Sequence, residues 1–230
     1  MKIGIIGAME QEVKILANEL TEITTWEEAG ASFYSGKLGK YEVVLTRSGI
    51  GKTLAAVTTT LLISHYDVDV VINTGSAGGI GEGLSIGDLV ISDKVAYSDV
   101  DVTAFGYEYG QMAQMPLYYE ADKTLVQLAM EASSSAMLNT RVGLIVSGDT
   151  FVSSEKQIHE IKEHFPNCLA NEMEGAAIAH VAYQYKKPFV VIRAMSDVGD
   201  ENASVNFDEF IIEAGEKSAK MVLALIAEID

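Results

Sequence analysis

The sequence is poor in cysteine and in basic residues. Its one cysteine, Cys168, cannot form a disulfide within the chain, which favours a reducing compartment such as the cytoplasm. The chain has sixteen Lys and Arg residues and thirty-three Asp and Glu residues, which gives a formal net charge of −17. A surface this acidic repels the phosphates of nucleic acids and of anionic lipids, so neither is an expected partner. The three arginines are few for a substrate that carries several phosphates.

Long apolar runs are also absent. The longest uncharged, apolar-rich stretch, 53–66, contains four threonines and is shorter than the ~18 residues that a membrane span needs. The apolar start of the chain stops at Met9 and acidic residues follow, which is not typical of a signal peptide. Hydrophobic residues make up 48% of the 230 residues, enough to bury a large core. We therefore expect a single cytoplasmic domain over 1–230.

Apolar runs of strand length alternate with segments of helical periodicity, and several of these runs are apolar throughout. Such runs are typical of a largely parallel sheet that helices cover on both faces, so we predict an α/β fold. The predicted strands are 2–8, 32–38, 41–48, 68–74, 88–97, 141–147 and 188–195. The predicted helices are 10–20, 51–66, 121–135, 154–164, 172–186 and 206–229.

Two glycine-rich segments invite a nucleotide-binding interpretation. The segment 46–53 (TRSGIGKT) resembles the end of a phosphate-binding P-loop, but Thr46 stands where the motif needs glycine. We favour a strand-to-helix turn that uses glycine for its tight backbone geometry. The segment 75–83 (GSAGGIGEG) fits no G-x-G-x-x-G frame, so we do not predict dinucleotide binding there. As a loop after a strand it would still let a ligand approach the backbone, and Ser76 adds a hydroxyl.

Three acids lie where open α/β sheets bind ligands, beyond the carboxyl ends of strands. Glu12 and Asp197 follow predicted strands, and Glu174 begins a predicted helix after a short segment around Leu169. Glu12 borders the apolar stripe of its helix and could be a general base, or simply an acid favoured by the helix dipole. Glu174 lies near a predicted helix N-terminus, which we expect to keep it ionised and able to accept from sugar hydroxyls. Glu172 would point elsewhere on that helix. Asp197 has no helix to cap, and burial would raise its pKa and suit it to a general acid.

The sequence offers little for metal or thiol chemistry. His159 and His164 are five residues apart, and there is no H-E-x-x-H motif and no pair of cysteines, so no metal site is predicted. Cys168 has neither a cation nor a helix N-terminus clearly beside it, which argues against a nucleophilic role.

Seven segments together carry a family resemblance. They are MKIGIIGAMEQE at 1–12, SGIGK at 48–52, VINTGSAGG at 71–79, DVTAFGYEYGQ at 101–111, VSGDTF at 146–151, EME at 172–174 and FVVIRAMSD at 189–197. In order and spacing the chain resembles, nearly end to end, the bacterial 5′-methylthioadenosine/S-adenosylhomocysteine nucleosidases, a nucleoside phosphorylase/hydrolase-like family. The resemblance implies a three-layer α/β sandwich with a mixed central sheet flanked by helices. It also implies a homodimer without cofactor or metal.

The activity that this resemblance implies is hydrolysis of the N-glycosidic bond of 5′-methylthioadenosine and S-adenosylhomocysteine. Glu12 would be the base that activates water, Asp197 would protonate adenine at N7, and Glu174 would bind the ribose hydroxyls. The other implied site residues are Met9, Ile50 and Phe207 in a 5′-alkylthio pocket, Phe151 and Val152 at adenine, Met173 beside the ribose, Ser76 and Arg193 placing the water and the acids, Ala77, Gly78 and Ser196 as further substrate contacts, and Val102 and Phe105 from the partner subunit.

The chain departs from the family pattern at three places. SDVD at 98–101 replaces an expected His-Asp-Ala-Asp, Ala113 replaces a proline, and Asn171 replaces a valine. The main alternative function is a purine nucleoside phosphorylase of the same fold, which would need cations near the anomeric carbon to hold phosphate. Glu12 and the few arginines favour hydrolysis instead. A non-catalytic nucleotide-binding module resting on 51–53 (GKT) is the third possibility.

Overall fold

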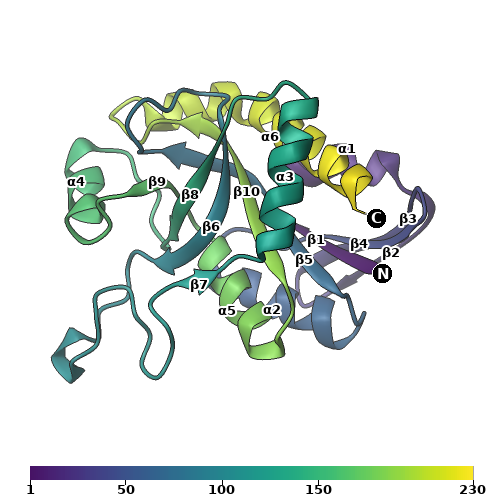
Figure 1. The fold of residues 1–230 in the computed structure, drawn as a ribbon, viewed down its shortest axis with the longest axis horizontal. Coiled ribbons are helices and arrows are strands. Elements are labelled where there is room, and N and C mark those ends of the chain that lie inside the picture. The colour runs from purple at the N-terminus through teal and green to yellow at the C-terminus, as the bar shows by residue number, and fades with distance from the viewer. Residues whose placement is uncertain (230) are drawn as a thin grey trace.

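The computed structural model describes residues 1–229 and contains a ten-stranded mixed β-sheet with helices on both faces (Figure 1). The strands are β1 Lys2–Gly7, β2 Thr21–Glu28, β3 Ala31–Leu38, β4 Tyr41–Arg47, β5 Val70–Gly79, β6 Leu89–Tyr97, β7 Tyr119–Glu120, β8 Thr140–Ser147, β9 Cys168–Glu172 and β10 Phe189–Asp197. The helices are α1 Glu10–Glu19, α2 Lys52–Ser64, α3 Lys123–Ser135, α4 Glu155–His164, α5 Gly175–Tyr185 and α6 Ala203–Glu228, with a 3₁₀ turn, η1, at Thr103–Phe105.

The strands follow the order β10-β6-β8-β9-β5-β1-β4-β3-β2, with β7 beside β6. Because β10 also pairs with β5, the strands β10, β6, β8, β9 and β5 form a closed ring. The pairs β1–β4, β1–β5, β5–β10, β6–β8 and β8–β9 are parallel. The pairs β2–β3, β3–β4, β5–β9, β6–β7 and β6–β10 are antiparallel. The sheet is therefore mixed, as the family resemblance implies, and not largely parallel.

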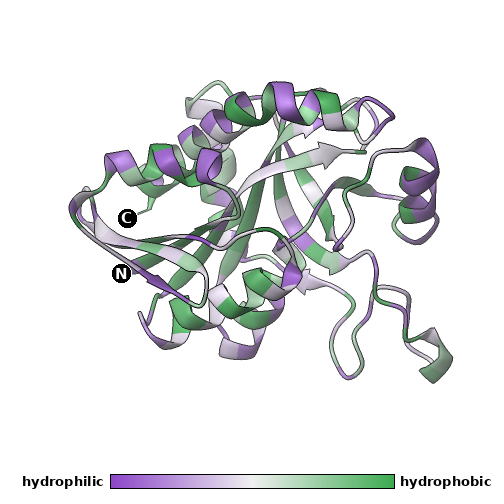
Figure 2. Cartoon of the chain, turned by 180° about the vertical axis from the view of Figure 1, so that it is seen from behind, coloured by the Kyte–Doolittle hydropathy of each residue, from purple (hydrophilic) through white to green (hydrophobic). Residues whose placement is uncertain are grey.

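Helices α1, α3 and α6 cover one face of the sheet, and α2 and α5 cover the other (Figure 1). Alternation along β1 shows why both faces are apolar. Ile3 and Ile5 pack in the core beneath α1, α3 and α6, whereas Ile6 belongs to the core shared with α2 and α5. Figure 2 shows the resulting band of hydrophobic strands between helices whose outer faces are more hydrophilic.

Most predicted elements match the structure within a few residues, and the differences arise from pairing. The glycine-rich segment expected to be a loop continues β5 to Gly79, because residues 75–79 pair with β10 and β9. The predicted helix over 172–186 begins only at Gly175, and Glu172 belongs to β9. Strand β2 was not predicted because it is a mostly exposed, polar edge strand. Within residues 1–229, no helix is long and apolar enough to cross a bilayer.

Candidate active site

A cavity of about 380 Å³ opens beside the carboxyl ends of β5, β9 and β10, at the N-terminus of α1. Fourteen of the predicted site residues line it: Met9, Glu12, Ile50, Ser76, Ala77, Gly78, Phe151, Val152, Met173, Glu174, Arg193, Ser196, Asp197 and Phe207. The lining residues that sequence reasoning did not assign to the site are Ala8, Thr150, Asn171, Glu172, Ser204 and Asp208.

Glu12 lies in the first turn of α1 and is buried. Its Oε2 accepts from the backbone N–H groups of Ala8 and Met9 at 2.8 and 2.9 Å. Its Oε1 accepts from the backbone N–H and the hydroxyl of Ser76 at 3.0 and 3.1 Å. Both oxygens of Glu12 thus act as hydrogen-bond acceptors, each for two protein donors. The α1 N-terminus and β5 thus hold this carboxylate at one place in the cavity.

Arg193, on β10, is the buried cation of the site. Its guanidinium donates to the Ser76 carbonyl at 3.0 Å and to Asn73 Oδ1 at 2.6 Å. It also donates to Glu172, and to Glu174 Oε2 at 3.4 Å. Burial lowers the pKa of Arg193, but the adjacent carboxylates, Glu172 first and Glu174 second, raise it more, so the net shift is upward. The guanidinium therefore stays charged and its charge is matched by carboxylates within the protein.

Glu172 is a buried acid whose part in the site the sequence analysis missed. It accepts from the backbone N–H groups of Glu174 and Gly175 at the start of α5, and from the Ser147 hydroxyl. The expectation that Glu172 points away from the site assumed a helix from 172 onward, and it is wrong. Glu172 is the last residue of β9, so its side chain faces Arg193 and the cavity.

Glu174 is the residue that precedes the first turn of α5. Its Oε1 accepts from the backbone N–H of Gly51 at 2.8 Å, which ties it to the glycine turn before α2. Burial raises the pKa of Glu174 to about 7, and Arg193 opposes this shift only in part. Burial thus opposes the ionised form that we expected the helix N-terminus to favour.

Asp197 is the last residue of β10 and is also buried. Its Oδ2 accepts from the Ser196 hydroxyl at 3.0 Å, and its Oδ1 accepts from the backbone N–H of Gly199 at 2.9 Å. Burial raises the pKa of Asp197, and these two hydrogen bonds oppose the shift only partly. The direction agrees with the expectation from the sequence.

Strand β5 sets the separation between these two acids. Glu12 is bonded to Ser76, whereas Asp197 pairs with Gly78 in the sheet register. Ser76 and Gly78 point to the same face of β5 and lie about 7 Å apart, at 3.3 Å per residue. Glu12 and Asp197 therefore meet the cavity at two different places along one strand.

The apolar walls of the cavity come from separate elements. The rings of Phe151 and Phe207 meet edge to face, with centroids 5.7 Å apart. Met9 and Ile50 add aliphatic surface from the ends of β1 and β4, and Met173 lies just before α5. The cavity therefore combines apolar walls with a small number of buried charged groups, as is usual for small-molecule sites.

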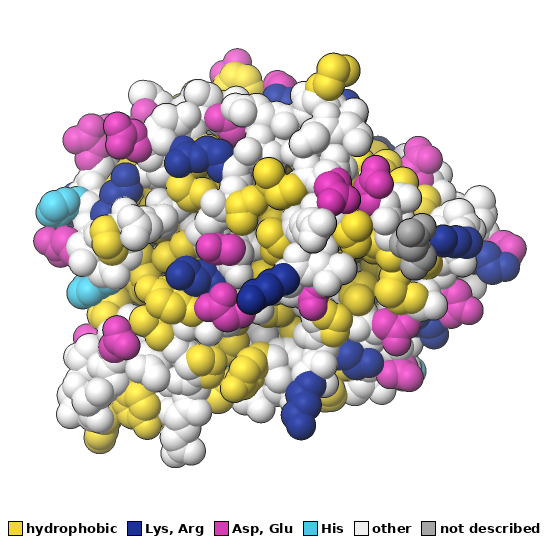
Figure 3. All heavy atoms as spheres, viewed as in Figure 1, with side chains coloured by type: hydrophobic (Ala, Val, Ile, Leu, Met, Phe, Trp, Pro, Cys, Tyr) yellow, Lys and Arg dark blue, Asp and Glu magenta, His cyan; other side chains and the backbone are white. Residues whose placement is uncertain are grey.

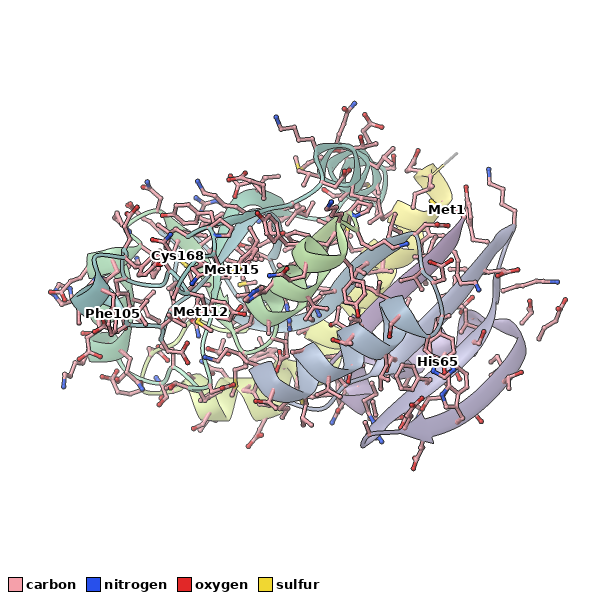
Figure 4. The ribbon with its side chains drawn as sticks, turned by 90° about the horizontal axis from the view of Figure 1, so that it is seen from below. Met1, His65, Phe105, Met112, Met115 and Cys168 are labelled. Carbon is pink, nitrogen blue, oxygen red and sulfur yellow. The ribbon has the colours of Figure 1, made fainter. Side chains whose placement is uncertain are left out.

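Val102 and Phe105 do not line the cavity of their own chain. They belong to the segment at η1 that projects from the body, at the lower left of Figure 1. Phe105 is 82% exposed. Figure 4 shows Phe105 at the extremity of the molecule, and Figure 3 shows hydrophobic side chains exposed on the same projection. Within residues 1–229, no three His, Cys, Asp or Glu side chains are grouped so as to hold a metal ion.

The model of the phosphorylase superfamily matches residues 2–227. A 5′-methylthioadenosine/S-adenosylhomocysteine nucleosidase of Staphylococcus aureus (strain bovine RF122 / ET3-1) is 49% identical over 227 residues, which cover 99% of this chain and 100% of that protein. The chain belongs to this nucleosidase family, within the phosphorylase superfamily.

Solved structures of family members confirm the predicted fold. The Neisseria meningitidis nucleosidase in complex with methylthio-immucillin-A gives a TM-score of 0.98 at 45% identity, covering 99% of each chain. The Streptococcus pneumoniae nucleosidase with the transition-state inhibitor MT-ImmA gives a TM-score of 0.97 at 51% identity, covering 100% of each chain. The α/β sandwich with a mixed central sheet is thus shared over the whole length of the chain.

Proposed function

We propose that this chain hydrolyses the N-glycosidic bond of 5′-methylthioadenosine and of S-adenosylhomocysteine. The products are adenine with S-methyl-5-thioribose or S-ribosylhomocysteine. The observation that carries the proposal is the pair Glu12 and Asp197, two buried acids in one cavity. Four protein donors bond the oxygens of Glu12, whereas burial raises the pKa of Asp197. Such a pair supplies a base and an acid to the two faces of one glycosidic bond.

Asp197 acts as the general acid. When the bond breaks, adenine leaves with the bonding electrons, and a proton delivered to N7 neutralises it. Because burial raises the pKa of Asp197, the carboxyl group is better able to hold that proton near neutral pH.

Glu12 acts as the general base. Loss of adenine leaves positive charge on the ribose. Water then attacks the ribose from the face opposite the departing adenine. The four donors around Glu12 hold its carboxylate in place, and this carboxylate accepts the proton of that water. Ser76 positions Glu12 by hydrogen bonds, and Arg193 donates a hydrogen bond to the backbone carbonyl of Ser76. The steps need only protein groups and water.

The remaining residues bind the substrate around these two acids. Glu174 accepts hydrogen bonds from the ribose hydroxyls, and Met173 packs beside the ribose. The further contacts are Phe151 stacking on adenine, the Val152 backbone at its edge, Ala77, Gly78 and Ser196 around it, and Met9, Ile50 and Phe207 in a slot for the 5′-alkylthio group.

A purine nucleoside phosphorylase is not favoured. Phosphorolysis would need positive charge free to bind phosphate near the anomeric carbon. The buried cation that lines the cavity, Arg193, is already bonded to Glu172 and Glu174. Glu12 adds negative charge where the nucleophile would arrive.

A homodimer completes the proposed site. In this arrangement the projecting segment of one subunit places Val102 and Phe105 against the 5′ end of the partner's cavity. An aromatic side chain as exposed as Phe105, on a segment that stands away from the body, supports this role. We also propose that residues 1–230 act as one domain and that the enzyme works in the cytoplasm.

The deciding experiment is incubation of the purified protein with 5′-methylthioadenosine in phosphate-free buffer. Free adenine and S-methyl-5-thioribose should appear in equal amounts. A strict requirement for phosphate, with a sugar 1-phosphate as product, would overturn the proposal.

A further inference from the structure

Asn171 is a buried polar residue for which the proposed mechanism has no use. It lies in β9, opposite Gly78 of β5, and is 7% exposed. Its side chain lines the cavity and also a neighbouring hollow that extends to Ser98 and Asp99. Its Oδ1 is buried and has no hydrogen-bond partner among residues 1–229.

The carboxamide of Asn171 lies close to the proposed general acid. Gly78 pairs with Asn171 on one side and with Asp197 on the other. A side-chain carbon added at Gly78 would lie 2.9 Å from Asp197 Oδ1 and 3.1 Å from Asn171 Oδ1. The missing side chain of Gly78 thus leaves one small space that both oxygens approach.

An unpaired oxygen at such a position is unfavourable for the free protein. A buried acceptor without a donor keeps its full desolvation cost, and asparagine is a poor residue for a strand. Since no hydrogen bond holds Oδ1, turning the carboxamide toward a bound molecule breaks none of its bonds. The feature is explained if a donor arrives with the ligand.

We propose that Asn171 is a specificity-determining residue that accepts a hydrogen bond from the exocyclic 6-amino group of the leaving base. In adenine, the N7 acceptor and the 6-amino donor lie on the same edge of the ring. A base that takes its proton from Asp197 at N7 therefore directs its amino group toward the adjacent side of the space above Gly78. Asparagine is suited to this edge because its amide presents an acceptor and a donor together. The inference rests on the proposed nucleosidase function and assigns one further contact within that site.

The test is a cycle of two proteins and two substrates. The substrates are 5′-methylthioadenosine and its analogue without the 6-amino group, and the proteins are the unmodified chain and Asn171→Val. The unmodified chain should prefer the amino-bearing substrate in kcat/KM, and Asn171→Val should reduce this preference by about tenfold. Loss of the amino group also changes the basicity of N7, but this effect is the same for both proteins and cancels in the cycle.

Asn167→Val is the matched control. Asn167 lies exposed in the turn before β9 and outside the cavity, so this variant should keep the unmodified preference. Thermal unfolding without ligand gives a second measurement. Asn171→Val should be at least as stable as the unmodified protein, because it removes an unpaired buried oxygen and suits the strand.

The outcomes distinguish an error in the proposed function from an error in the role of Asn171. Failure of the unmodified protein to release base from either substrate would contradict the proposed function itself. Normal cleavage by the unmodified protein, with an unchanged preference in Asn171→Val, would overturn the role of Asn171 alone. Asn171→Ala repeats the measurement with a smaller side chain. If neither variant folds, the oxygen is needed by the free protein and the inference is wrong.

Discussion

Replacement of Asp197 by asparagine separates proton delivery from shape. The side chain keeps its size and planarity, and an amide oxygen can still accept from the N–H of Gly199, as Asp197 Oδ1 does at 2.9 Å. The Ser196 hydroxyl also faces the Ala77 carbonyl at 3.4 Å, so it can donate there while it accepts from the new amide. We therefore expect Asp197→Asn to fold normally and to bind substrate.

The expected loss of kcat in Asp197→Asn is about 10²-fold or more, the range for removal of a general acid. Burial of Asp197 also makes its contribution to the stability of the fold depend on pH. Because the pKa of Asp197 is raised on folding, its contribution to stability is fully present below pH ~4, near its unfolded value, and is lost as pH rises through the folded pKa. Asparagine carries no such loss. The variant should therefore gain stability relative to the unmodified protein as pH rises from about 4 to 7.

The assay is adenine release from 5′-methylthioadenosine under saturating conditions, together with unfolding midpoints at pH 4 and pH 7. The decisive pattern is a large loss of kcat combined with a stability difference that grows with pH. Near-normal turnover by folded Asp197→Asn would refute the general-acid role. A stability difference that does not change with pH would refute the reasoning about burial.

Three further predictions concern other parts of the site. Glu12→Gln should lower kcat by about 10²-fold or more, because an amide cannot take the proton of water, and near-normal turnover would contradict this role. Phe207→Ala should reduce kcat/KM for 5′-methylthioadenosine more than for adenosine, because the methylthio contact is worth on the order of 1–2 kcal/mol. Equal use of both nucleosides by the unmodified protein would contradict the slot. Light scattering should show a dimer, and an active monomer would rule out a site shared through Phe105.

Much of the site could be predicted because its acids lie at strand ends that are visible in the sequence. Asp197 follows an apolar run with no helix to cap, and Glu12 follows the first strand. Both acids therefore lie where an α/β sheet binds ligands, and both are residue types that can transfer protons. Glu172 could not be found in this way. Its importance depends on β9, a five-residue strand whose membership in the sheet is decided by its neighbours β5 and β8 rather than by its own periodicity. The helical periodicity of the residues that follow led to a predicted helix that already included Glu172.

The glycine-rich end of β5 leaves space for the buried charged groups of the site. At Gly75 the backbone has φ +154°, and an added side-chain carbon would lie 2.7 Å from both Arg193 Nη1 and Glu12 Oε1. At Gly78 the same addition would come within 2.9 Å of Asp197 Oδ1. Side chains at these points would separate the buried charged groups from the backbone that orders them. The absence of a side chain at Gly75 and at Gly78 therefore lets buried charged groups approach the backbone of β5 closely.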